Sequence, residues 1–97
     1  FRDAYTAKWC IGPVSFATNS YDATNILLSV IDEVGTDRKA IRDGFAAVKD
    51  FEGVNGTINF AENGDLVAYQ GIYEVEGNTP KYVGAFKIEN GKVVKVN

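Results

Sequence analysis

The spacing of apolar residues changes once along the chain, near Gly53, and this change limits the folds that the sequence can adopt. Before that point, apolar residues recur every three or four positions, as they do on one face of an α-helix. After it, short runs rich in β-branched and aromatic residues are typical of half-buried strands. We therefore expect one partial domain over residues 1–97, with a helical part at 1–52 and a strand-rich part at 53–97.

The first expected helix covers residues 1–9, where Phe1, Tyr5 and Trp9 fall on one face. It ends before the Gly-Pro pair at residues 12–13, because neither residue continues a helix readily.

The second expected helix follows a short extended segment at residues 14–18. A side-chain oxygen of Asn19 or Ser20 is expected to cap its first turn. Asp22 would then lie in that turn, where a negative charge is favoured by the helix dipole. The helix is expected to end at Gly35.

A third helix is expected to begin at Thr36 or Asp37, and both later helices carry an apolar stripe. The stripe of the second helix consists of Ala23, Ile26, Leu27, Val30, Ile31 and Val34. The stripe of the third consists of Ala40, Ile41, Phe45, Val48 and Phe51. Two short helices cannot cover both stripes by packing on one another, so a further apolar surface is expected to complete the core.

Four short runs in the second half are expected to form strands: TINF, YQGIYEV, KYVGAF and KVVKV. The Asn-Gly pairs at residues 63–64 and 90–91 suit tight hairpin turns, because both residue types tolerate a positive φ. The expected local fold is three helices followed by a small antiparallel β-meander.

The composition offers little for catalysis, since the chain has no histidine and one cysteine, Cys10. The usual general base near neutral pH is missing, and so are the donors for a zinc site. Cys10 is expected to be an inert, buried or half-buried thiol. We expect no enzymatic activity, no catalytic residue, no metal and no cofactor.

The glycine-rich stretch at residues 51–69 has two features that a phosphate or metal site could use, its glycines and its acidic turn. It lacks the Gly-Lys-Ser/Thr ending of a phosphate loop and leads into a strand, whereas a phosphate site would need a helix N-terminus. Its ENGD turn has too few oxygen ligands at alternating spacing for calcium. This stretch is therefore interpreted as a helix exit followed by a hairpin.

Charge and hydropathy limit the partners. The net charge is −3, and no run of Lys and Arg is longer than Arg38-Lys39, so nucleic acid is not expected to bind. No apolar run approaches the roughly 20 residues of a membrane span. The chain contains no methionine and opens within an expected helix, which indicates a piece of a longer protein.

Phe16 is open to two interpretations. It could be a strand residue whose ring points into a core. Alternatively, a ring beside small polar residues and free helix N–H groups could hold a small amphipathic ligand.

The order of motifs from Ser20 to Asp65 resembles the C-terminal part of the type I periplasmic substrate-binding proteins. These are the branched-chain amino acid receptors of ABC transporters, in the extracellular ligand-binding receptor family. The matching features are Tyr-Asp-Ala at the start of a helix, Asp-Arg with Ala-Ile in the next, and the Asn-Gly-Asp turn at residues 63–65. Phe51, Gly53 and Gly56 complete the pattern. The helix at residues 1–9 also resembles the one that precedes this region in the family.

The resemblance implies an α/β fold, as the C-terminal fragment of a bilobed protein that closes on a small ligand between its lobes. The implied ligand is a branched-chain or other amino acid, or a related small carboxylate. By position, Phe16 would form a wall of the ligand site, with Ala17 and Asn19 as further candidates. The residues that hold the ammonium and carboxylate groups would come from segments outside this chain.

The resemblance further implies an ABC permease as partner of the full-length parent, in the periplasm or anchored at the surface of a bacterial cell. Two other functions stay open. The chain could be a self-contained α+β module that binds a protein partner, or the ligand-sensing domain of a regulator with the same fold. A fragment with uncovered faces could also form a homodimer.

Overall fold

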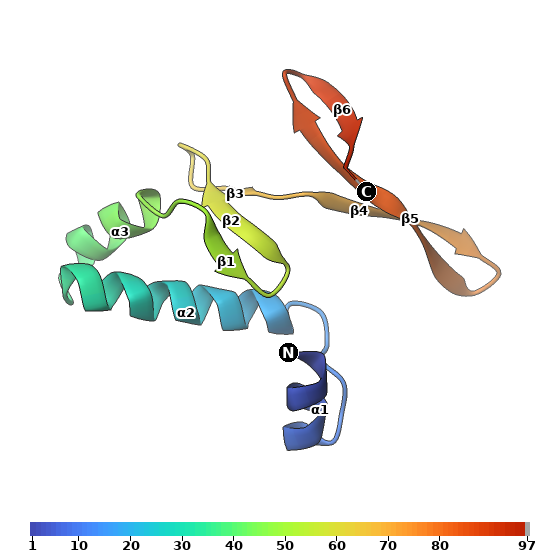
Figure 1. Ribbon diagram of the computed structural model, residues 1–97, viewed down its shortest axis with the longest axis horizontal. Coiled ribbons are helices and arrows are strands. Elements are labelled where there is room, and N and C mark those ends of the chain that lie inside the picture. Colours follow the sequence, from blue (N-terminus) through green and yellow to red (C-terminus); the bar gives the residue numbers. More distant parts are fainter. Residues whose placement is uncertain (97) are drawn as a thin grey trace. The chain divides into compact units, whose positions relative to one another are not determined.

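Residues 1–96 are described by the structure, which is a computed structural model. The chain forms two compact units that meet between Leu66 and Val67. The first unit holds all three helices and the first small sheet up to Leu66, and the second holds a three-stranded sheet (Figure 1). The observed division therefore falls at residue 66, whereas the change of apolar period falls near residue 53.

The helices are α1 (Arg2–Trp9), α2 (Ala17–Val34) and α3 (Arg38–Ala46). The strands are β1 (Phe51–Gly53), β2 (Gly56–Phe60), β3 (Leu66–Val67), β4 (Gln70–Glu76), β5 (Thr79–Glu89) and β6 (Lys92–Lys95). They form two sheets, β1-β2-β3 and β4-β5-β6, and the pairs β1–β2, β4–β5 and β5–β6 are antiparallel. The expected order of three helices followed by antiparallel strands is confirmed, although the strands divide between two sheets.

Helix α2 begins earlier than its sequence predicts. Its N-cap is Phe16, whose side chain makes no capping hydrogen bond and whose φ is 68°. The expected extended segment at 14–18 and the expected cap at Asn19 or Ser20 were therefore wrong. The Ala17 N–H donates to the Val14 carbonyl at 3.1 Å, so the chain turns directly into the helix.

Helix α3 begins as predicted but ends sooner. The Asp37 carboxylate accepts a hydrogen bond from the Ala40 N–H at 3.0 Å, which confirms Asp37 as its N-cap. The helix ends at Ala46, so Val48 and Phe51 do not belong to its stripe. Asp50 has a φ of 51°, which a continuing helix cannot accommodate, and Phe51 starts strand β1 instead.

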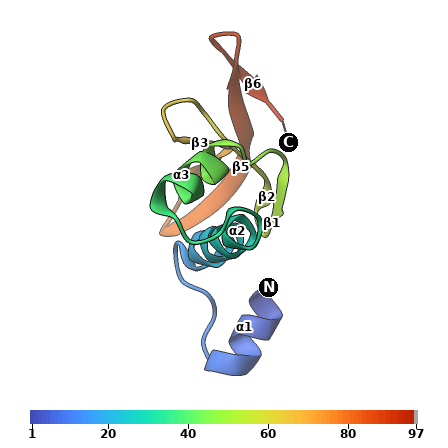
Figure 2. The same ribbon diagram turned by 90° about the vertical axis from the view of Figure 1, so that its left-hand side faces the viewer.

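The core of the first unit lies between α2 and α3. Ile26 and Val30 are its buried apolar side chains. Gly44 of α3 lies directly against Val30, and the ring of Phe45 meets that of Phe60 on β2 edge to face, with centroids 6.1 Å apart. Figure 2, in which α2 is seen nearly end-on, shows α3 and the β1–β2 hairpin on the same side of that helix.

Both predicted Asn-Gly turns are confirmed as hairpins. Asn90 and Gly91 have φ values of 52° and 74° and join Glu89 to its partner Lys92 in a two-residue loop. The turn after β2 is closed by the Ala61 N–H, which donates to the Asp65 carbonyl at 2.8 Å.

The second unit is a twisted antiparallel sheet with little buried surface (Figure 1). Within residues 67–96 only Gly84 is buried. A β-bulge interrupts the β4–β5 register between Ile72 and Tyr73, beside the edge-to-face pair of Tyr73 and Tyr82. In the described part of the chain, no helix combines the length and apolarity that crossing a membrane requires.

Candidate functional site at the start of helix α2

The three residues predicted to contact a ligand lie together at the beginning of α2. Phe16 is the N-cap residue and its side chain is 76% exposed. Ala17 is the half-buried first residue of the helix, and Asn19 is exposed in the first turn. The interpretation of Phe16 as a strand residue pointing into a core was wrong, because its ring is exposed and its backbone is left-handed. Its contact with a ligand stays a prediction.

This helix end carries little local stabilisation. The first four N–H groups of any helix lack partners within the helix, and a side-chain cap normally satisfies one of them. Phe16 has no side-chain oxygen and provides no such cap. The Thr18 hydroxyl donates instead to the side-chain oxygen of Asn19, over a long 3.4 Å.

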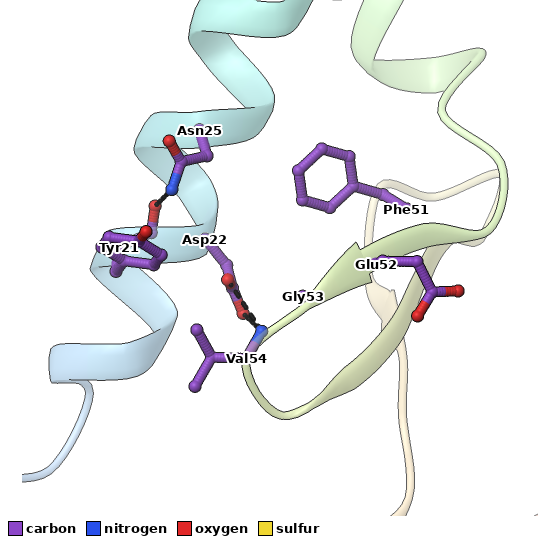
Figure 3. Close-up of a pocket in the computed structure, with 7 residues that line it drawn as sticks. All are labelled: Tyr21, Asp22, Asn25, Phe51, Glu52, Gly53 and Val54. Atoms are coloured by element: carbon purple, nitrogen blue, oxygen red, sulfur yellow. Dashed lines mark hydrogen bonds between the residues drawn. The ribbon is translucent and has the colours of Figure 1, made fainter. Parts of the chain in front are cut away.

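The β1–β2 turn lies beside this helix end and encloses a hollow with it. Figure 3 shows the hollow between α2 and the turn, lined by Tyr21, Asp22, Asn25, Phe51, Glu52, Gly53 and Val54. None of the three residues predicted to bind a ligand lines it. Because no lysine or arginine lines the hollow either, it offers no charge partner for a ligand carboxylate.

Asp22 holds the turn against the helix. Its side chain is 5% exposed, and both carboxylate oxygens accept from the Val54 N–H at 3.0 Å (Figure 3). The expectation that Asp22 sits in the first turn facing the dipole was wrong, because α2 starts at Ala17 and Asp22 lies in the second turn. Its carboxylate therefore accepts a hydrogen bond from the hairpin instead of interacting with the N-terminus of the helix.

Gly53 makes that approach possible. A Cβ atom on Gly53 would lie 2.7 Å from Asp22 Oδ2 and 2.7 Å from Ile58 Cδ1. A side chain here would therefore force either the carboxylate or the strand to move.

A second link joins the same two elements. The Asn55 side-chain amide donates to the Thr18 hydroxyl at 2.7 Å. Sequence reasoning missed both this link and the Asp22–Val54 contact, because each joins residues more than thirty positions apart. The signals that could have suggested them are Asp22 within Tyr-Asp-Ala and Gly53 before the turn.

Other candidate chemistry finds no support. Within residues 1–96, no group of three or more His, Cys, Asp or Glu side chains is arranged to hold a metal ion. Cys10 is exposed, so the expectation of a buried or half-buried thiol was wrong. It ends α1 in the left-handed conformation, with φ at 59°, on an exposed turn.

Comparison with known proteins places these elements in a larger fold. No protein-family model and no curated protein sequence matches the chain. Among solved structures, the chain is similar to a leucine-binding protein, LivK, from Thermotoga maritima MSB8, with 28% identity and a TM-score of 0.63. The chain has the fold of a periplasmic-binding-protein segment. The match covers 100% of this chain and 24% of that protein, so the chain spans about a quarter of its length. The resemblance to the receptor family is thereby confirmed.

Proposed function

We propose that this chain is part of a substrate-binding receptor of an ABC transporter, which captures an amino acid or a related small carboxylate. Binding would take place outside the cytoplasmic membrane of a bacterium, in the periplasm or at the cell surface. The full-length receptor would close its two lobes on the ligand and pass it to a permease. It would act by binding alone, without changing the ligand chemically.

The observation that carries the proposal is the match over the whole chain to a leucine-binding protein. At 28% identity and a TM-score of 0.63, the likeness extends to sequence as well as to fold. The partner at the site would be a small molecule, and the chain would supply one wall of the pocket.

Phe16 is proposed as the main contact of that wall, with Ala17 and Asn19 beside it. The exposed ring offers an apolar surface for an aliphatic or aromatic side chain of the ligand. The groups that bind the ammonium and carboxylate of the ligand would come from the remainder of the receptor.

Isothermal titration calorimetry on the full-length receptor tests this function. Leucine, isoleucine, valine, phenylalanine and a small carboxylate such as benzoate are titrated in turn, and at least one is expected to bind. Phe16→Ala is expected to weaken that binding about tenfold or more, because truncating the ring removes apolar contact area. Val14→Ala is the matched control, since Val14 is also exposed and nearby but lies outside the proposed wall. If none of these ligands binds the wild-type receptor, the proposal is wrong.

A second candidate function is a protein-interaction module, and the second unit favours it. Val75, Ile88 and Val93 are each more than 70% exposed on its sheet. Ile88 and Val93 are register partners on β5 and β6, and adjoining exposed apolar side chains are a feature of surfaces that another protein covers. A sensing role in a regulator would use the same ligand-binding step as transport. It would differ only in the partner protein that recognises the closed form of the two lobes.

A further inference from the structure

The two links between helix α2 and the β1–β2 hairpin have a consequence for the ligand site. We infer that the turn at residues 53–56 is a clamp that positions the start of α2, and that Asn55 is a positioning residue for the ligand-contact wall. This inference rests on the proposed function, because the wall is that of the proposed receptor.

The start of α2 depends on partners outside the helix. Phe16 provides no side-chain cap, and a helix end without a cap frays more readily than one with it. Within the described part of the chain, the side-chain hydrogen bonds from other elements to the first two turns come from Val54 and Asn55.

The two links meet the helix one turn apart. Thr18 accepts from Asn55 at 2.7 Å, and Asp22 accepts from Val54 at 3.0 Å. Residues four apart lie on the same face of a helix, so both links hold one face of α2. Two attachment points fix the direction of the helix end as well as its position.

The geometry of the clamp depends on two glycines. Gly53 pairs with Gly56 in the β1–β2 register, and Gly56 has a φ of 122°, a conformation that favours glycine. At the other end of the hairpin, Asn59 accepts from the Asp50 N–H at 2.8 Å and donates to the Asp50 carboxylate at 3.0 Å. The glycine turn therefore sets where Val54 and Asn55 meet the helix, whereas the Asn59 bonds stay within the hairpin and do not reach α2.

The link at Thr18 reaches the proposed wall directly. Thr18 lies between Ala17 and Asn19, and its hydroxyl donates to the Asn19 side-chain oxygen at 3.4 Å. The interaction thus runs from Asn55 to Thr18 and on to Asn19. Loss of the Asn55 amide would free Thr18 and loosen the turn that carries Phe16.

The test compares two asparagines of the same hairpin in the full-length receptor. Asn55→Ala removes the link to α2, whereas Asn59→Ala removes only bonds within the hairpin. We expect Asn55→Ala to raise the Kd for the ligand about three- to tenfold, which corresponds to the loss of one hydrogen bond at the site. Asn59→Ala is expected to lower the melting temperature at least as much but to leave the Kd unchanged. Equal effects of the two variants on the Kd, or no effect of Asn55→Ala, would overturn the inference.

Two further measurements isolate the Asn55–Thr18 bond. Thr18→Val removes the acceptor with little change in shape. Because both substitutions break the same hydrogen bond, the Kd of the Asn55→Ala/Thr18→Val double variant should be no higher than that of the single variant that binds the ligand more weakly. Additive losses would contradict the role of this bond. Hydrogen exchange of the ligand-free receptor should be faster at residues 20–24, whose amides form the first hydrogen bonds of α2, in Asn55→Ala than in Asn59→Ala.

The exchange measurement also separates the two hypotheses. If the wild-type receptor binds none of the titrated ligands but exchange at residues 20–24 responds to Asn55→Ala, the proposed function fails while the clamp stands. If the receptor binds a ligand but exchange does not distinguish the variants, the clamp fails alone.

Discussion

At the scale of single residues, Asp22 shows how position along a helix decides what a carboxylate does. In the first turn, Asp22 would interact with the helix dipole from an exposed position. Because α2 begins at Ala17, Asp22 lies one turn further on and faces the hairpin. A buried carboxylate needs hydrogen-bond donors, and the Val54 N–H donates to that of Asp22.

Gly53→Ala tests how closely this contact is packed. The new Cβ would lie 2.7 Å from Asp22 Oδ2 and from Ile58 Cδ1, so either the carboxylate or the strand must move. We expect a loss of about 1–3 kcal/mol in the free energy of unfolding, measured by urea denaturation of the full-length receptor.

Gly12→Ala is the control for this substitution. Nothing lies within 4 Å of a Cβ on Gly12, so Ala there should change stability by less than about 0.5 kcal/mol. A similar effect at both glycines would show that the Asp22 contact is not tightly packed.

At the scale of elements, the packing of α2 on α3 depends on a glycine within a helix. Gly44 lies where Val30 of the facing helix projects, and Val30 is 4% exposed. A glycine inside a helix costs roughly 1 kcal/mol relative to Ala, so its presence here reflects the space that Val30 needs.

Gly44→Ala is therefore expected to destabilise the protein in spite of its better helix propensity. A Cβ on Gly44 would lie 2.5 Å from Val30 Cγ1, and forcing the helices apart should cost about 1–3 kcal/mol. Thermal and urea unfolding of the full-length receptor would measure the loss.

The double variant Gly44→Ala/Val30→Ala tests the cause of that loss. Val30→Ala removes the methyl group that the new Cβ would meet, so the double variant should be more stable than the sum of the two single losses predicts. Strict additivity would mean that the two side chains do not compete for space.

The elements also differ in how far sequence could predict them. The cap of α3 was predicted at Thr36 or Asp37 and is Asp37, and the Asn-Gly pair forms the predicted turn between β5 and β6. Both depend on contacts within a few residues. The start of α2 was missed because its support comes from Asn55, thirty-seven positions away. The end of α3 was missed because the apolar period continues through Val48 and Phe51, although Asp50 turns the chain between them.

At the scale of the whole molecule, each unit leaves most of its apolar side chains exposed. Ile26 and Val30 are the buried apolar residues of the described chain, while Leu28, Val75 and Ile88 are among those more than half exposed. The helix stripes thus bury less than they could, as the sequence indicated. The match to 24% of a longer protein is consistent with a core completed by other segments.

This exposure predicts the behaviour of the 97-residue chain when it is produced alone. So small a core cannot offset the conformational entropy of ordering, so we expect broad, weakly cooperative thermal unfolding at low concentration. Self-association would cover apolar surface, so the apparent stability should rise with protein concentration. Circular dichroism melts over a hundredfold range of concentration measure this. A sharp, concentration-independent transition would favour the self-contained interaction module.

The sequence by itself determined the order of three helices and antiparallel strands, a cap of α3 at Thr36 or Asp37, and the Asn-Gly hairpins, because each depends on periodicity or on contacts within a few residues. It also carried the resemblance to the receptor family, which the structural match supports. Only the tertiary structure decided where α2 starts, that Phe16 is exposed, and that Asp22 and Thr18 hold the hairpin. The contacts of Asp22 and Thr18 depend on hydrogen bonds between residues far apart in the chain, which no local pattern specifies.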